Sequence, residues 1–231
     1  KVQVELISSL AERQTPNAFE SLMRVVDSED AKVRRAAILS TRELAHKENL
    51  SDMIQLALRM RSSEQGLAEN AVVKTAKRTD AVKMCTNQVI KLYQENDVLD
   101  QKASMLRILG GLSHKNALPL MRETLRTGDD PLKVEILRSF AEWPTADPLP
   151  DLFDVAEKSE NETFALLALR GIIELIELDS SVSKDQQLEM YKKAMDMAGK
   201  DEEKRRIFSK LSGRKTFAAM NYAARFIDDP A

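Results

Sequence analysis

Four basic residues recur at nearly constant spacing and are the strongest candidates for binding chemistry in this sequence. They stand in the segments VKTA, LRIL, LRSF and LRGI, and successive members are 33, 31 and 32 residues apart. Cations at equivalent positions of successive helices would form a row suited to an acidic partner or a phosphate backbone. We call this set the basic ladder: Lys74, Arg107, Arg138 and Arg170.

The alternative is that the ladder is neutralised within the fold. Glu142 and Glu174 follow Arg138 and Arg170 by four residues, the spacing of an ion pair on one helix. Arginines of one helix could also pair with acidic residues of the next. A second basic cluster has its own acidic neighbours, Asp201 to Glu203, which favour a solvated helix face. That cluster comprises Lys204, Arg205, Arg206, Lys210, Arg214 and Lys215.

Catalytic and metal-binding patterns are missing from the sequence. The single cysteine, Cys85, stands among apolar residues at helical spacing, which is typical of a buried thiol rather than a nucleophile. His46 and His114 stand at predicted helix ends, where the helix dipole favours a histidine, and are too far apart to act together. Neither a dinucleotide-binding motif, a P-loop nor a nucleophile elbow is found. We therefore predict a protein that is not an enzyme and that holds no metal and no cofactor.

Composition favours a helical protein with a substantial core. Hydrophobic residues make up 43% of the 231 residues, too many for a disordered chain, whereas aromatic residues make up only 5%. Strong helix formers dominate. The net charge of −2 argues against a general polyanion binder, so nucleic acid is not the expected partner. No apolar run reaches the length of a transmembrane helix, which predicts no membrane insertion.

Apolar residues at i, i+3, i+4 and i+7 predict helices almost throughout the chain. Acidic, Ser or Asn residues precede every second helix as predicted N-caps. The expected helical ranges are 1–13, 16–27, 30–46, 51–62, 64–78, 81–95, 98–113, 117–127, 131–143, 148–158, 161–178, 184–198, 201–212 and 215–227.

A period near 32 residues with two helices per period predicts an α-solenoid. The stretch EILRSFAEWPTADPLPDL, residues 135–152, contains the only tryptophan and three prolines, Pro144, Pro148 and Pro150. Proline ends one helix and suits the start of another. We therefore interpret this stretch as a turn between repeats and expect 1–231 to form a single array.

Two segments resemble HEAT repeats, the armadillo-like family of α-solenoids. DAKVRRAAILSTREL, residues 30–44, is similar to a second HEAT helix, with its acidic cap, the Val33-Arg34 pair and the small Ala36-Ala37. Residues 109–143 resemble the HEAT connection in which a helix ends at glycine and Ala-Leu-Pro opens the next. This resemblance implies an all-α, right-handed α–α superhelix of about six to seven helical pairs.

The phrases VQVELISSLAER and LALRGIIEL resemble, more particularly, HEAT modules of secreted bacterial multidomain proteins. In such proteins the array accompanies a concanavalin-like sugar-hydrolase domain or a haem domain, and the location this implies is periplasmic or otherwise extracytoplasmic. Lys1–Arg13 has the pattern of a second helix without its first, and FIDDPA that of an opening without its helix. We therefore expect a fragment of a longer protein with an apolar edge at each end.

The predicted function is that of a non-catalytic protein-interaction or scaffold module. Its concave surface, formed by the second helices, would bind a protein partner or a neighbouring domain of the same polypeptide. One alternative is a nucleic-acid-binding HEAT protein with a basic concave face, whose affinity would fall steeply with salt. Another is a HEAT-like lyase subunit, which would require a polar cleft.

Overall fold

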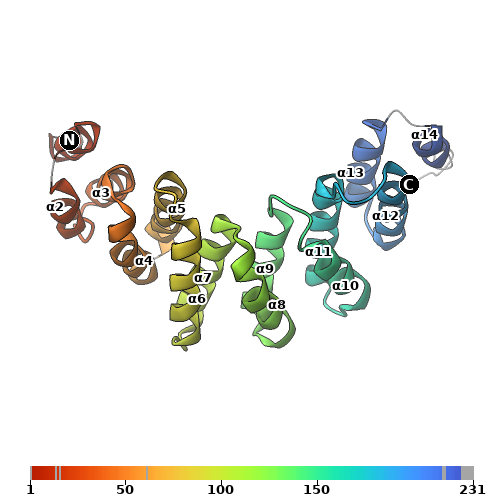
Figure 1. Cartoon of the computed structure of the whole chain (residues 1–231), viewed down its shortest axis with the longest axis horizontal. Helices are drawn as coiled ribbons and strands as arrows, with labels where there is room; N and C mark the ends of the chain where they lie inside the picture. The colour runs from red at the N-terminus through yellow and green to blue at the C-terminus, as the bar shows by residue number, and fades with distance from the viewer. Residues whose placement is uncertain (1, 14, 16, 61, 215–216, 225–231) are drawn as a thin grey trace. The chain divides into compact units, whose positions relative to one another are not determined.

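The computed structural model describes residues 2–13, 15, 17–60, 62–214 and 217–224, and this part of the chain is all-helical, as predicted (Figure 1). By contact density the chain divides into two compact units, Lys1–Met121 and Arg122–Ala231. The proline-containing stretch 135–152 therefore lies inside the second unit. The single array over 1–231 stays a prediction.

The first unit is built from seven α-helices, two short 3₁₀ helices and the first turn of an eighth α-helix, within the residues that the structure describes. Nearly all begin and end within a few residues of the expected ranges. They are α1 (Val2–Glu12), α2 (Ala18–Val25), α3 (Ala31–Leu44), η1 (Lys47–Asn49), α4 (Leu50–Arg59), α5 (Ser62–Arg78), α6 (Val82–Gln94), α7 (Leu99–Leu112), η2 (Lys115–Ala117) and α8 (Leu118–Thr127).

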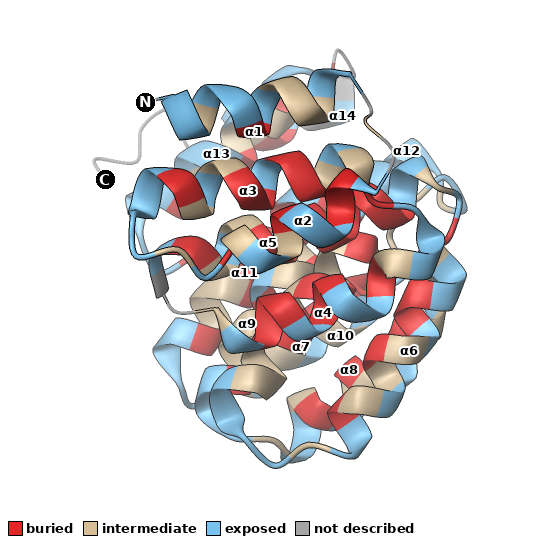
Figure 2. Cartoon of the chain, turned by 90° about the vertical axis from the view of Figure 1, so that its left-hand side faces the viewer, coloured by how far each residue is buried: buried red, intermediate tan, exposed pale blue. Residues whose placement is uncertain are grey.

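Helix α3 packs on α1, α2 and α5, and α5 packs in turn on α4 and α7. Ile7, Leu22 and Val33 join α1, α2 and α3 in one buried cluster. Figure 2 shows buried residues alternating with exposed ones along α3 and α4, as expected for amphipathic helices. The predicted apolar periodicity is thus the pattern that forms this core.

The second unit contains the rest of α8 and six further α-helices in its described residues. They are α9 (Asp130–Ala141), α10 (Leu149–Lys158), α11 (Glu162–Leu175), η3 (Ile176–Leu178), α12 (Lys184–Met197), α13 (Asp201–Ser212) and α14 (Phe217–Ala224). Helix α11 packs on α9, α10, α12 and α13 and is the centre of this unit.

The turn between α9 and α10 has the predicted architecture. Helix α9 ends at Ala141, and α10 begins directly after Pro148. Trp143 is buried between them, with its ring edge-to-face against Phe140 at a centroid distance of 6.1 Å. The tryptophan therefore fills the core rather than a binding surface.

The predicted helix caps are confirmed at some positions and wrong at others. Asp30 accepts a hydrogen bond from the backbone N–H of Lys32, and Asn161 caps α11 in the same way. The N-caps of α7 and α13 are instead Val98 and Lys200, neither of which makes a side-chain cap bond. In α13 the acidic residues lie one to three positions further on, inside the first turn, where the helix dipole also favours them.

None of the described helices is both long enough and apolar enough to cross a membrane.

Candidate functional site

The four ladder residues lie on four different helices. Lys74 on α5 and Arg107 on α7 belong to the first unit, and Arg138 on α9 and Arg170 on α11 belong to the second. Lys74 and Arg138 are exposed, whereas Arg107 and Arg170 are half-buried. Their alignment on one face across both units stays a prediction.

Arg107 is held by a glutamate on the neighbouring helix. Its Nε lies 2.9 Å from Oε2 of Glu69, and a terminal nitrogen lies 2.8 Å from Oε1. Both carboxylate oxygens are therefore engaged by the planar fork of the guanidinium. The Glu69 side chain, on α5, is only 7% exposed. This pair links α5 to α7.

Arg170 makes the corresponding link from α11 to α13. Its Nε and one terminal nitrogen donate to Oε1 of Glu203, at 3.2 and 3.0 Å, and the terminal nitrogen also reaches Glu202 at 3.4 Å. The expected pairing of Arg170 with Glu174 is wrong, because Glu174 accepts from Lys210 on α13 at 2.7 Å.

Arg138 has a different neighbour from the expected one. Its ion pair is with Glu135, three residues earlier and 3.7 Å away, rather than with Glu142. The Arg138 side chain is 61% exposed, and an exposed pair at that distance contributes little. Of the ladder, Lys74 and Arg138 are thus the members whose charge faces solvent.

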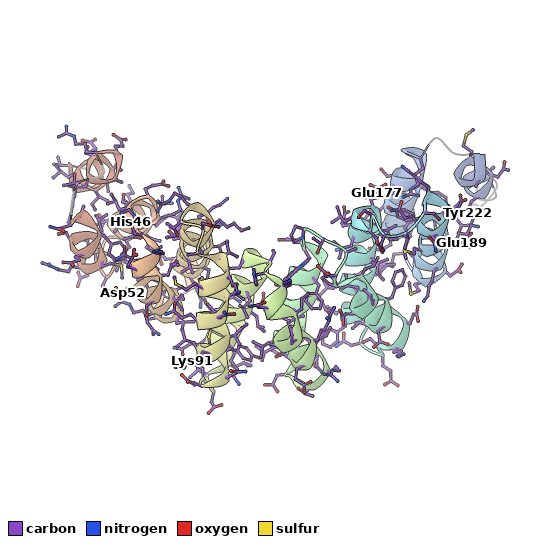
Figure 3. All side chains as sticks on the ribbon, viewed as in Figure 1. His46, Asp52, Lys91, Glu177, Glu189 and Tyr222 are labelled. Atoms are coloured by element: carbon purple, nitrogen blue, oxygen red, sulfur yellow. The ribbon has the colours of Figure 1, made fainter. Side chains whose placement is uncertain are left out.

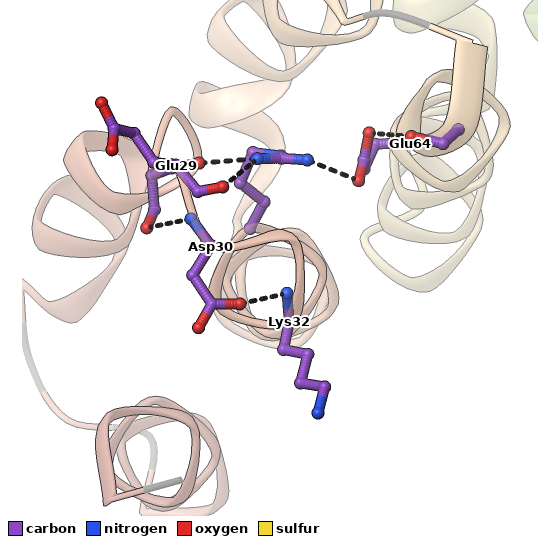
Figure 4. A network of polar contacts seen from close by, with 7 residues as sticks. Glu29, Asp30, Lys32 and Glu64 are labelled. Atoms are coloured by element: carbon purple, nitrogen blue, oxygen red, sulfur yellow. Dashed lines mark hydrogen bonds and ion pairs between the residues drawn. The ribbon is translucent and has the colours of Figure 1, made fainter.

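Arg34 also pairs with a nearly buried glutamate of another helix, as Arg107 and Arg170 do (Figure 4). In the sequence it was noted only as part of the Val33-Arg34 pattern. It donates to Glu64 on α5 at 3.2 Å and to the backbone carbonyls of Ser28 and Glu29 at 2.8 and 2.9 Å. A hydrogen bond from the Ser63 hydroxyl, followed by the contact with Arg34, lowers the pKa of Glu64 below its usual value, although burial acts in the opposite direction. Each of these arginines therefore ties its helix to the second-next helix.

The second basic cluster is largely neutralised by internal contacts. Arg206 pairs with Glu202 in the preceding turn, at 3.2 Å. Arg214 is buried, donates to the carbonyl of Lys184 and to the side chain of Gln187, and lies over the Tyr191 ring at 5.1 Å. Burial raises the pKa of Tyr191. Lys215 falls outside the described residues.

A groove of about 720 Å³ lies in the second unit. It is formed by the end of α8, the start of α9, α10 and the start of α11, and we call it the α8–α11 groove. Its apolar lining comes from Leu125, Pro150, Val155 and Phe164. Its charged lining consists of Arg122, Arg126, Lys133, Lys158, Asp130, Asp151 and Asp154.

Internal pairs use part of that charged lining. Nε of Arg122 lies 2.9 Å from Oδ2 of Asp151, and Lys158 donates to Asp154 one turn earlier on α10. That hydrogen bond raises the pKa of Lys158. Lys133 and Asp130 form no ion pair with any described residue. The groove therefore offers one free charge of each sign beside apolar side chains.

The cysteine and the two histidines considered for catalysis lie in the core or at the start of short helices. Cys85 is fully buried on α6, and burial raises its pKa to about 12, which leaves the thiol protonated and unreactive near neutral pH. His46 and His114 open the 3₁₀ helices η1 and η2 rather than ending α-helices (Figure 3 labels His46). Nδ1 of His114 accepts a hydrogen bond from the backbone N–H of Asn116 at 3.2 Å.

Metal ligation finds no support in the part of the chain that the structure describes, where no three His, Cys, Asp or Glu side chains gather at ligating distance. Comparison of the chain with protein-family models and with curated proteins found no match.

Proposed function

We propose that this chain is a non-catalytic protein-interaction module, a HEAT-type α-solenoid with six to seven helical pairs in a right-handed superhelix. Support comes from the packing of alternate helices within each unit: α1, α3, α5 and α7 in the first, and α9, α11 and α13 in the second. Three of the bonds between such helices have the same sequence separation. Ser40 to Ile7, Thr75 to Arg42 and Arg170 to Glu203 each span 33 residues.

The observation that carries the proposed function is the α8–α11 groove. Its volume of about 720 Å³ falls within the range of ligand sites, and both apolar and charged side chains line it. A segment of a protein partner carries apolar groups and charges of both signs in the same way. Lys133 and Asp130 would fix its orientation, because each would gain an ion pair that no described residue supplies.

Nucleic acid is a poorer fit to the same surfaces. Three carboxylates stand among the four cations of the groove, so it lacks the continuous positive surface that a phosphate backbone needs. Two of the four ladder cations, Arg107 and Arg170, already bond to buried glutamates. A partner with mixed charge meets neither obstacle.

Selection from a random peptide library on the immobilised chain tests this function. Binders that occupy the groove should lose about tenfold or more in affinity on Lys133→Glu. The matched control is Arg205→Glu, an exposed cation of the same unit that lies outside the groove lining, which should change affinity by about twofold at most.

Two results would refute the groove as the binding surface. Selected peptides could be indifferent to Lys133→Glu but lost on Lys74→Glu with Arg138→Glu, which would assign binding to the ladder. Alternatively, only polyanions could bind, with affinity falling by orders of magnitude between about 50 and 200 mM salt.

A further inference from the structure

Helices α3 and α5 lie side by side in the first unit and run in the same direction. Arg34, near the start of α3, bonds to Glu64 near the start of α5. The hydroxyl of Thr75, near the end of α5, donates to the carbonyl of Arg42 near the end of α3 at 3.3 Å. These two contacts fix which residues of the two helices stand at the same level.

Each of the two helices has one exposed face. At 100° per residue, the exposed residues of α3 fall within about 120° of its circumference, and so do those of α5. In α3 this face lies between the flank that contacts α1 through Ser40 and the flank that contacts α5 through Arg34. In α5 it lies between the flank that contacts α3 through Glu64 and the flank that contacts α7 through Glu69. Because the helices are parallel and their flanks follow in the same order, both exposed faces point to the same side. We call the combined surface the α3–α5 face.

The carboxylates of these helices are mostly withdrawn from the α3–α5 face. Glu64 and Glu69 on α5 are buried, and each is bonded to an arginine of a neighbouring helix. Among the described residues of α3 and α5, Glu43 is the one exposed carboxylate, and it pairs with Arg42 at 2.8 Å. The exposed charge of the face is therefore positive.

Four exposed cations of the α3–α5 face lack an acidic partner within the described part of the chain. Figure 4 shows one of them, Lys32, pointing away from Glu64. The four residues that form no ion pair there are Lys32, Arg35, Lys74 and Lys77.

An apolar and uncrowded middle separates these cations into two pairs. Leu39 on α3 is 39% exposed. On α5, Gly66 has no atom within 4 Å of the position that a Cβ would occupy. One pair of cations lies toward the start of α3 and the other toward the end of α5. At 1.5 Å per residue, the two pairs are about 15 Å apart along the helix axes.

This arrangement selects a partner that is acidic and partly apolar. Carboxylates of the partner would gain ion pairs with cations that have none, and an apolar side chain would remove Leu39 from water. A helix with carboxylates about eleven residues apart, and leucines between them on the same side, matches the spacing. Nucleic acid fits less well, because neither α3 nor α5 contains an aromatic residue on which a base could stack.

We propose that the α3–α5 face binds an acidic amphipathic segment of a protein partner. The carboxylates of the segment pair with the four cations, and its apolar side chains cover Leu39. The proposal does not rest on the α8–α11 groove, because the groove belongs to the second unit and shares no residue with this face.

Fluorescence anisotropy of the full chain with a labelled helical peptide tests the proposal. The peptide carries Glu residues about eleven positions apart with Leu residues between them. We expect saturable binding that becomes about tenfold or more weaker on Arg35→Glu with Lys77→Glu. The matched control is Lys83→Glu with Lys115→Glu, which changes the net charge equally at exposed cations of α6 and η2 and should alter the affinity by about twofold at most.

Further variants separate the charged and apolar contributions. Lys32→Glu with Lys74→Glu should also weaken binding about tenfold, and it replaces the first pair of changes if circular dichroism shows that those reduce the helix content. Leu39→Ser should weaken binding about fivefold, whereas Leu39→Met, which keeps an apolar side chain, should leave it nearly unchanged. A peptide with Gln in place of each Glu should bind about tenfold more weakly.

The proposal is overturned if no saturable binding occurs, if the Gln peptide binds as well as the Glu peptide, or if reversal of the face cations weakens binding no more than the control does. Loss of peptide binding on Lys133→Glu alone would place the peptide in the α8–α11 groove and would also overturn it. A DNA duplex that binds more tightly than the peptide, with affinity falling by orders of magnitude between about 50 and 200 mM salt, would assign the face to nucleic acid instead.

Discussion

Replacement of Arg107 by methionine should destabilise the first unit by about 2–3 kcal/mol. Removal of one partner from a fully buried ion pair costs about 3–5 kcal/mol, because the other charge is left buried and unpaired. Glu69 meets that condition at 7% exposure, but Arg107 is 33% exposed, so water partly screens the pair and reduces the loss. Methionine retains most of the apolar stem, so the loss comes from the polar contacts of the guanidinium, chiefly the two hydrogen bonds to Glu69.

Urea unfolding followed by circular dichroism measures this loss. Fluorescence of Trp143, the only tryptophan and a buried residue of the second unit, reports separately on that unit. The double variant Arg107→Met with Glu69→Leu should recover most of the stability, since replacement of a whole buried pair by apolar residues is close to neutral. Arg138→Met is the matched control and should cost less than about 0.5 kcal/mol, because Arg138 is 61% exposed, lies 3.7 Å from Glu135 and leaves a carboxylate that has a further contact.

An Arg107→Met variant as stable as Arg138→Met would refute this reasoning. The contact with Glu69 would then contribute nothing to folding. A double variant as unstable as Arg107→Met alone would show that the cost lies in lost packing of the arginine stem rather than in the unpaired carboxylate.

Three further changes test the packing. Gly171→Ala should reduce the free energy of unfolding by about 1–3 kcal/mol, because the added Cβ would lie 3.1 Å from Cα of Ala141. Gly66→Ala has open space around the added methyl group and should stabilise α5 by about 0.5–1 kcal/mol. Equal melting temperatures for the two variants would contradict this. Cys85 should be inert to Ellman's reagent in the native state. Its pKa is about 12 in the folded state and about 8.5 in the unfolded state, so the free energy of unfolding should fall as the pH rises from the lower value to the higher. The fall should be less steep in Cys85→Ala. Asn161→Ala should cost about 1 kcal/mol in urea unfolding, because two backbone N–H groups of α11 lose their acceptor; an unchanged midpoint would show that water replaces the cap.

The helices could be predicted from the sequence because local spacing decides them. The 3.6-residue periodicity and the prolines around Trp143 act within one turn or one loop, and there the expected ranges agree with the structure. Caps were less predictable. In α13 three consecutive acidic residues in the first turn interact favourably with the helix dipole. Lys200 at the N-cap therefore destabilises the helix little.

The ion pairs of the ladder could not be predicted from the sequence. The i, i+4 rule proposes Glu174 for Arg170, but it ranks only neighbours on the same helix. Glu203, 33 residues away, is almost fully buried, and a charge pair is stronger where water is excluded. The separations of the three pairs, 30, 33 and 38 residues, vary too much for a fixed spacing rule to find them.

These internal pairs bear on where a partner can be recognised. Arg34, Arg107 and Arg170 are each committed to a nearly buried glutamate, and each commitment fixes the position of one helix against the second-next one. A charge used in this way cannot be released to a partner without leaving its glutamate unpaired, at a cost of a few kcal/mol. Recognition is therefore cheapest where charged groups have no internal partner. Among the described residues discussed above, Lys133 meets that condition, and it lies in the α8–α11 groove beside apolar side chains.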